Sequence, residues 1–279
     1  WLRRRGAPAV AVLMYHDLCD DGDLANWMRV PRSRFAAQLD ACAELGAFVH
    51  PEDLEAPERL PRGRLGFLVT FDDGYANNAR LAAPLLAARK IPALFCVSPA
   101  PRVSQEPFWT DLVVTPLQAR AVAELDLGRF GLGVFRFRAG PPAARWDDIQ
   151  RLLVAIKAVG NDDHPQVAAI LAWFRDTYAA ELREHLPRFR PLRVEELARL
   201  AAEPHFVVAS HGHEHRILTR LTDDALAATL ARSRDLLANA TGRPVTQLAY
   251  PNGDHDARVR AATFRAGFRL AYTTRSALA

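Results

Sequence analysis

The sequence predicts an α/β protein built on a parallel sheet or barrel. Short apolar runs alternate along the chain with longer stretches of helical period, which is the pattern of consecutive βα units. Some runs, such as 67–69, are apolar at every position, which is typical of strands covered on both faces. The length of 279 residues suits one large domain, and a hydrophobic share of 49% excludes global disorder.

The candidate strands share a short length and a mostly apolar composition. They lie at 9–15, 47–50, 67–71, 93–97, 206–210, 247–250 and 269–274.

Helical segments between the strands have recognisable ends. Ser33 is the expected N-cap of one helix, which Gly46 ends, and Thr222 is the expected start of another, which ends near Gly242. Pro84 lies inside a further helical segment, so it should kink that helix or mark its true start.

One block interrupts the alternation. Residues from about 99 to 192 separate two candidate strands and are mainly helical. Because so long a segment must have structure of its own, we expect an insertion over one end of the sheet. The expected organisation is therefore a single domain over 1–279 with this insertion.

Several classes of protein are excluded by composition. No apolar run approaches the length of a transmembrane helix. Cys19, Cys42 and Cys96 are too widely spaced for a disulfide framework or a zinc knuckle. A net charge of +4 with interspersed signs does not indicate a nucleic-acid partner.

The ends of the chain leave its compartment and oligomeric state open. Trp1 is not an initiator Met, so a targeting segment was removed or the chain was trimmed, and the abrupt end at Ala279 indicates a missing tail. The protein is cytoplasmic, or it belongs to the cell envelope or exterior after loss of a targeting segment.

Two adjacent carboxylates follow the apolar run 67–71. Asp72 and Asp73 precede Gly74, which allows a tight turn. Ligands of parallel α/β proteins bind at the carboxyl ends of strands, and buried carboxylates there need a cation or hydrogen-bond donors. Taken alone, the pair could equally cap the next turn.

Histidines follow the apolar run 206–210 in the same way. His211 and His215 are four residues apart, so both imidazoles would share one face of a helical turn, a spacing that suits a divalent metal. The alternative is a solvated histidine-rich loop.

The two motifs complete each other. Two His and one Asp make three protein ligands with room for water, which is typical of an open catalytic site. A nearby carboxylate outside the ligand set could act as general base. We expect a divalent cation, zinc by this ligand set, with nickel and cobalt as alternatives.

With these two motifs, the sequence resembles the polysaccharide deacetylase family, which comprises carbohydrate esterases of the chitooligosaccharide deacetylase type. The family's first motif, Thr-Phe-Asp-Asp-Gly, stands unaltered at 70–74. Its His-[Ser/Thr]-x-x-His motif maps to 211–215, with Gly212 in the Ser/Thr place. Its Arg-x-Pro-[aromatic]-Gly motif maps to 249–253, which keeps only the Pro and the Gly. The resemblance covers most of 9–98 and 194–274.

The resemblance implies a distorted (β/α)7 barrel and a role for each matched residue. It implies metal ligation by Asp73, His211 and His215 and a general base at Asp72. The oxyanion or substrate contacts it implies are Asn252, through its backbone N–H, with Tyr75 and Pro251.

Two departures from the family pattern bear on the mechanism. Ala249 replaces the Arg that orients the base in the family, and no Leu-x-His motif, the usual source of the general acid, follows Tyr272. His16, at the end of the first candidate strand, resembles the acid of the permuted poly-N-acetylglucosamine deacetylases. The candidate acid is therefore His16, although a histidine satisfied locally at the strand end would look the same.

The expected function is a metal-dependent hydrolase that removes N-acetyl groups from an amino-sugar polysaccharide or glycan, with a metal-activated water as nucleophile. A carbohydrate-binding pseudoenzyme of the same fold is one alternative, motivated by Ala249. A sugar O-acetyl esterase or deformylase is another.

Overall fold

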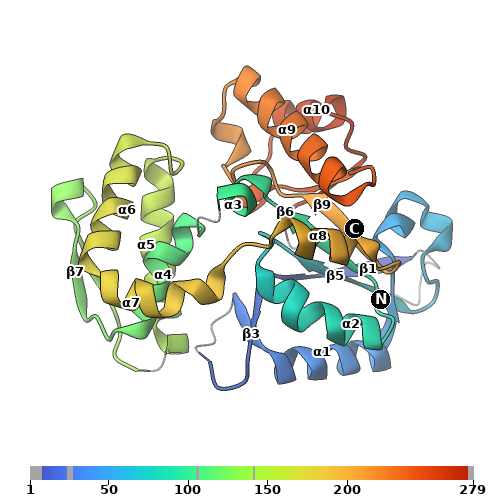
Figure 1. The fold of residues 1–279 in the computed structure, drawn as a ribbon, viewed down its shortest axis with the longest axis horizontal. Coiled ribbons are helices and arrows are strands. Elements are labelled where there is room, and N and C mark those ends of the chain that lie inside the picture. The colour runs from blue at the N-terminus through green and yellow to red at the C-terminus, as the bar shows by residue number, and fades with distance from the viewer. Residues whose placement is uncertain (1–7, 24–27, 105–106, 141, 276–279) are drawn as a thin grey trace.

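The computed structural model describes residues 8–23, 28–104, 107–140 and 142–275. Trp1 and Ala279, at the two ends of the sequence, lie outside these residues. The molecule consists of a curled sheet with helices packed around it and a second, mainly helical lobe at one side (Figure 1). Helices α1 and α2 lie along one part of the curled sheet, and α9 and α10 lie along another.

The main sheet is parallel throughout the described residues. Its strands run in the order β1-β5-β6-β9-β10-β11, and β4 pairs with the first half of β5. These strands are β1 (Ala9–Tyr15), β4 (Gly46–Phe48), β5 (Leu65–Phe71), β6 (Ala93–Val97), β9 (Phe206–Ser210), β10 (Gln247–Ala249) and β11 (Leu270–Tyr272).

Each of these strands coincides with a candidate strand of the sequence to within two residues at either end. No pairing joins β1 to β11 in the described residues, so the barrel is open at this seam. The predicted α/β fold with a distorted (β/α)7 sheet and a helical insertion is thus confirmed.

The helices around the sheet bury its outer face. They are α1 (Arg32–Leu45), α2 (Ala83–Ala88), α8 (Val194–Ala202), α9 (Asp223–Thr241) and α10 (Ala257–Arg265). The short helix α3 (Pro99–Ser104) follows β6 and contacts α9. Alternate strand residues such as Val69, Phe71 and Phe95 pack against apolar helix residues such as Leu86 and Leu230 in one continuous core. Each fully buried side chain of this size contributes about 1.5–3 kcal/mol to folding.

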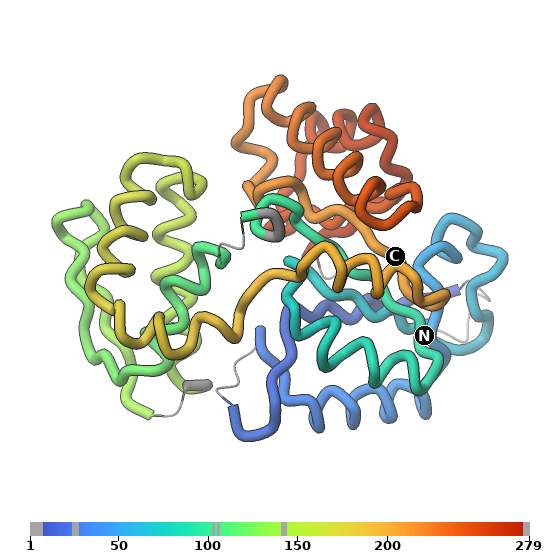
Figure 2. The backbone as a smooth tube through the Cα atoms, viewed as in Figure 1, coloured from blue at the N-terminus to red at the C-terminus, as the bar shows by residue number. Residues whose placement is uncertain are grey.

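The lobe at the side contains the middle of the expected insertion (Figure 2). It comprises α4 (Trp109–Ala119), α5 (Pro142–Val159), α6 (Pro165–Thr177), α7 (Ala179–His185) and an antiparallel pair, β7 (Glu124–Asp126) with β8 (Val134–Arg136). Its buried residues, among them Leu117, Ile149 and Phe174, form a hydrophobic cluster of their own. This lobe therefore has the internal structure that its length required.

Shorter elements complete the chain. A parallel pair joins β2 (Asp17–Cys19) and β3 (Arg29–Pro31). Short 3-10 turns lie at Pro51–Glu55, Pro57–Arg59, Gly128–Phe130, Leu186–Phe189, Leu218–Arg220 and Pro251–Gly253, and a π turn lies at Asn78–Ala82. No helix of the described residues is both long and apolar enough to span a bilayer.

The expected helix ends are confirmed in part. Thr222 caps α9 by accepting from the Ala225 N–H, and Gly242 ends it at φ 68°. Pro84 stands in the first turn of α2, directly after the π turn. The prediction of Ser33 as an N-cap is wrong: the N-cap position is two residues earlier, at Pro31, and the Ser33 hydroxyl donates to Asp21 at 2.6 Å.

Candidate metal centre

The first motif lies where β5 leaves the sheet. The Asp72 N–H donates to the carbonyl of Tyr15 on β1 at 2.8 Å, so pairing of the two strands continues to the first carboxylate. Asp73 and Gly74 then take positive φ values of 72° and 88°. A Cβ at Gly74 would also lie 2.8 Å from a methyl of Val97, so the turn requires glycine both for its backbone and for space. The turn leaves both carboxylates buried.

The second motif lies at the end of β9, two strands away. Its conformation differs from the expected helical turn: no helix forms over 211–217, and Gly212 and His215 have φ values of 72° and 62°. The two imidazoles converge because the loop turns back at these residues, with ring centroids 4.9 Å apart. His211 and His215 therefore come together as the spacing of four predicted, but a loop with positive φ values brings them together and not a helical turn.

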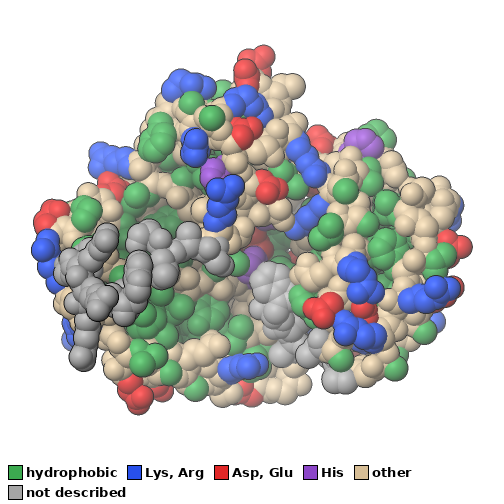
Figure 3. Space-filling view, turned by 180° about the vertical axis from the view of Figure 1, so that it is seen from behind, with side chains coloured by type: hydrophobic (Ala, Val, Ile, Leu, Met, Phe, Trp, Pro, Cys, Tyr) green, Lys and Arg blue, Asp and Glu red, His purple; other side chains and the backbone are tan. Residues whose placement is uncertain are grey.

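Asp73, His211 and His215 meet in one cluster. The Asp73 Oδ1 atom lies 3.4 Å from His211 Nε2 and 3.2 Å from His215 Nε2. One ligand atom from each residue lies within 4.8 Å of the others. Acidic and histidine side chains are visible in a hollow near the middle of the molecule (Figure 3).

The donor atoms of this cluster fit a cation. His211 Nδ1 lies 2.9 Å from the carbonyl oxygen of Ala249, which can only accept a hydrogen bond, so the proton sits on Nδ1 of the neutral ring and the Nε2 lone pair faces Asp73. Asp73 Oδ1 is buried and has no hydrogen-bond partner. Lone pairs directed at one another in a buried site repel unless a positive charge lies between them. Two imidazoles and one carboxylate form such a set.

The pKa values follow the same electrostatics. Burial by itself raises the pKa of Asp73, but the charge of His215, the close polar contacts with His211 and His215, and the charge of His16 outweigh it and hold that pKa well below its ordinary range. For His211, burial lowers the pKa, and the charges of Asp72 and Asp73 reverse the shift. The carboxylate is thus ionised at neutral pH, as a metal ligand must be.

Asp72 lies beside the cluster without belonging to it. Its carboxylate interacts with the buried thiol of Cys96 on β6. Burial first, and then the charge of Asp72, raise the pKa of this thiol well above its ordinary range. Cys96 and Ala249 belong to a small apolar cluster on the inner side of the sheet. The predicted base is therefore near the site where the family's Arg is replaced by an apolar residue.

His16 lies at the end of β1, within electrostatic range of Asp73, whose pKa its charge helps to lower. The structure thus brings the candidate acid to the same end of the sheet as the cluster.

The third motif forms a tight turn after β10. Asn252 is held at φ 60°, a left-handed conformation that asparagine tolerates better than most residues. Its side chain is bonded at both ends: Nδ2 donates to Asp254 at 2.8 Å, and Oδ1 accepts from Lys157 at 2.6 Å. Pro251 packs against the loop of His211 and His215, where its Cγ lies 3.3 Å from the position of a Cβ at Gly212.

Tyr75 forms part of the wall and not of the open site. It is only 1% exposed, and its hydroxyl contacts both carboxylate oxygens of Asp111 at 3.0 and 3.2 Å. Its ring packs against Phe108, which in turn lies 5.3 Å from the ring of His215. Asp111 and Phe108 belong to the insertion, so the insertion contributes to the wall of the site.

Two partners were not found from the sequence. Lys157 is an ordinary helix residue in sequence, and Ala249 acts through its backbone carbonyl, which any residue would supply. Neither has a motif, and only the folded chain places them at the site.

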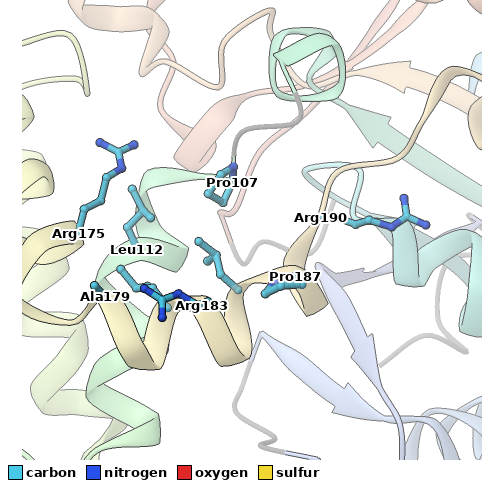
Figure 4. Close-up of a pocket in the computed structure, with 9 residues that line it drawn as sticks. Pro107, Leu112, Arg175, Ala179, Arg183, Pro187 and Arg190 are labelled. Atoms are coloured by element: carbon cyan, nitrogen blue, oxygen red, sulfur yellow. The ribbon is translucent and has the colours of Figure 1, made fainter.

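A cavity of about 490 Å³ lies nearby, between the insertion and the segment that leads back to the sheet. Its lining includes Pro107, Leu112 and Arg183 but none of the cluster residues (Figure 4). It is therefore a separate feature and not the place where the carboxylates and histidines meet.

Comparison with known proteins agrees with this fold. The structure of IcaB from Ammonifex degensii is 21% identical, with a TM-score of 0.58 over 96% of this chain and 84% of that one. A deacetylase of Streptococcus pyogenes, PplD in complex with acetate, is 15% identical, with a TM-score of 0.58 over 98% and 87%. The deacetylase domain of BpsB from Bordetella bronchiseptica is 17% identical, with a TM-score of 0.53 over 96% and 89%. At these identities the likeness shows the shared fold.

A family model gives a separate match to part of the chain. The polysaccharide deacetylase family model matches residues 142–271, from α5 to β11. Among curated proteins, none matches this chain in sequence. The matched segment and the shared fold agree with the resemblance to polysaccharide deacetylases seen in the motifs of the sequence.

Proposed function

We propose that this protein is a metal-dependent deacetylase that hydrolyses N-acetyl groups of an amino-sugar polysaccharide or glycan. One observation supports this above the others. Asp73, His211 and His215 converge in a buried cluster suited to a cation, with a further carboxylate, Asp72, next to them.

Zinc is the cation that we propose, because imidazole and carboxylate ligands in a three-residue set suit it, with nickel or cobalt as alternatives. When bound, such a cation supplies a Lewis acid that polarises the acetyl carbonyl and lowers the pKa of a coordinated water. Asp73, His211 and His215 would hold it, with the tautomer of His211 set by the carbonyl of Ala249.

The remaining residues would move protons and stabilise charge. Asp72 would take the proton of the attacking water as general base. His16 would donate a proton to the departing amine, so that the products are a free amino sugar and acetate. The backbone N–H of Asn252 would donate to the developing oxyanion, while Tyr75 and Pro251 would shape the substrate pocket.

The direct test is acetate release from N-acetylglucosamine oligomers. We expect release by the zinc-loaded protein, loss after chelation, recovery on zinc addition and no recovery in Asp72→Asn. Acetate release that persists in the chelated protein and in Asp72→Asn would exclude this mechanism.

Two alternative functions use the same fold. Replacement of the family's Arg by Ala249 motivates a carbohydrate-binding pseudoenzyme, which would bind zinc and glycan without turnover. An O-acetyl esterase or deformylase would use the same residues on another bond. Rates measured side by side on N-acetyl, O-acetyl and N-formyl sugars separate these alternatives.

A further inference from the structure

The insertion reaches the candidate active site through the end of α5. Lys157 lies in the last turn of this helix and is half-buried. Its ammonium donates to the Oδ1 atom of Asn252 at 2.6 Å, although the two residues are 95 positions apart in sequence. Asp254 accepts from the other end of the same amide at 2.8 Å. The side chain of Asn252 is therefore bonded at both ends.

The same helix end is fixed to the loop of the second motif. The guanidinium of Arg220 donates to the carbonyl oxygen of Lys157. Beyond the helix, the side chain of Asn161 accepts from the N–H of Ile217 at 3.0 Å. These contacts join the insertion to the histidine loop as well as to the Asn252 turn, so the position of Lys157 relative to both is defined.

The charge of Lys157 acts on the same region. Burial lowers the pKa of its ammonium, while the carboxylates of Asp73 and Asp254 raise it. Lys157 also contributes to lowering the pKa of His215, after burial as the main cause. The ammonium is thus within electrostatic range of the metal-ligand cluster.

Lysine is rare in this chain. Of the 36 basic residues, Lys90 and Lys157 are the only lysines and the rest are arginines. An ammonium is a compact donor on a flexible stem, whereas a guanidinium is a wide planar fork. A donor that must end at a single amide oxygen favours the smaller group.

We propose that Lys157 is a positioning residue of the active site: it holds Asn252 in the left-handed conformation in which the backbone N–H of that residue can face the reacting acetyl group. This inference rests on the proposed function. It implies that the insertion is needed for turnover as well as for the wall of the site. Lys157 acts on the oxyanion contact and not on the metal ligands, so its loss should affect kcat and leave zinc binding intact.

The kinetic test compares Lys157→Met, Lys157→Arg and the control Lys90→Met, whose side chain is exposed. For Lys157→Met we expect kcat on N-acetylglucosamine oligomers to fall about 10- to 100-fold, the range typical of outer-shell positioning residues. KM and zinc stoichiometry should stay within twofold of the original protein. Lys157→Arg should recover part of kcat, and Lys90→Met should match the original protein. An unchanged kcat in Lys157→Met would overturn the proposal.

A second readout does not depend on activity. In ¹⁵N-lysine-labelled protein only two lysine side chains give signals, and Lys90→Met assigns them. We expect Asn252→Ala to shift the Lys157 signal in this sample. In uniformly ¹⁵N-labelled protein we expect Lys157→Met to shift the backbone amide signal of Asn252, with the zinc-free fold retained. An Asn252 amide that is unaffected in Lys157→Met would overturn the proposal even if kcat falls. If the original protein releases no acetate, the proposed function fails, and the amide shift alone decides whether Lys157 positions Asn252.

Discussion

The Nδ1 atom of His211 lies 2.9 Å from the carbonyl oxygen of Ala249. Ala249 occupies the place where the family has an arginine, and its side chain cannot replace that residue. Its backbone nevertheless orients a metal-ligand candidate, because the hydrogen bond fixes which imidazole nitrogen keeps its lone pair. Part of the third motif's role is therefore independent of the residue's identity.

Removal of one proposed ligand should abolish tight metal binding. We expect Asp73→Asn to weaken zinc affinity at least about 100-fold, more than the change of an outer-shell partner does, because a neutral amide replaces the charged ligand. Isothermal titration calorimetry of the metal-free protein measures this. The control is His205→Gln, a histidine of the same region outside the cluster, which should bind zinc normally. Equal zinc affinity in Asp73→Asn would contradict the ligand assignment.

Asp72→Asn should remove the base and keep the metal. We expect kcat to fall by about 10²–10⁴, the usual contribution of general acid–base catalysis, with zinc stoichiometry unchanged. The loss should be as large on an aryl acetate as on an N-acetyl sugar, because both need an activated water. Asp20→Asn, an exposed carboxylate paired with Arg80, serves as the control. A variant that retains full activity would place the base elsewhere.

His16→Gln should distinguish substrates by their leaving groups. An amine must be protonated as it leaves, whereas a nitrophenolate departs without a proton, so the acid matters only for the first. We expect kcat on N-acetyl sugars to fall by about 10²–10⁴ and hydrolysis of 4-nitrophenyl acetate to change little. A parallel loss on both substrates would indicate that His16 has another role.

A pH effect on stability is expected from Asp17. Burial, only partly offset by Arg29, raises the pKa of this carboxyl to about 6 in the folded protein, against about 4 in an unfolded chain. Between these values the folded state keeps a proton that the unfolded state has lost, so the free energy of unfolding falls by about 2 kcal/mol as the pH rises from 4 to 6.

Asp17→Asn should lack this loss, because an amide does not titrate. Urea unfolding of the metal-free protein at pH 4, 5, 6 and 7 measures the effect as the difference between the two proteins. Asp20→Asn should instead follow the original protein at every pH. If the curves of Asp17→Asn and the original protein ran parallel, the Asp17 carboxyl would not carry the raised pKa.

The strands and the main site residues could be predicted because their signals are local. Apolar runs marked each strand of the main sheet, and the carboxylates and histidines stand directly after such runs, where parallel strands deliver side chains to one edge. Local chemistry was less reliable at the helix start near Ser33 and at the loop of His211 and His215. Ser33 bonds Asp21 and does not cap the helix. Gly212 and His215 have positive φ values, so their loop does not form the helical turn that the spacing of the histidines predicted.

By itself, the sequence determined the α/β architecture, the insertion and the residues that meet at the candidate metal centre. Tertiary structure alone decided that the insertion brings Lys157 to Asn252. It also decided that the Tyr75 hydroxyl donates to Asp111 and that Ala249 acts through its carbonyl. The physical reason is that propensity and hydrophobic period depend on near neighbours. A contact across 95 positions depends on how whole lobes pack, and a backbone carbonyl has no signature in the sequence.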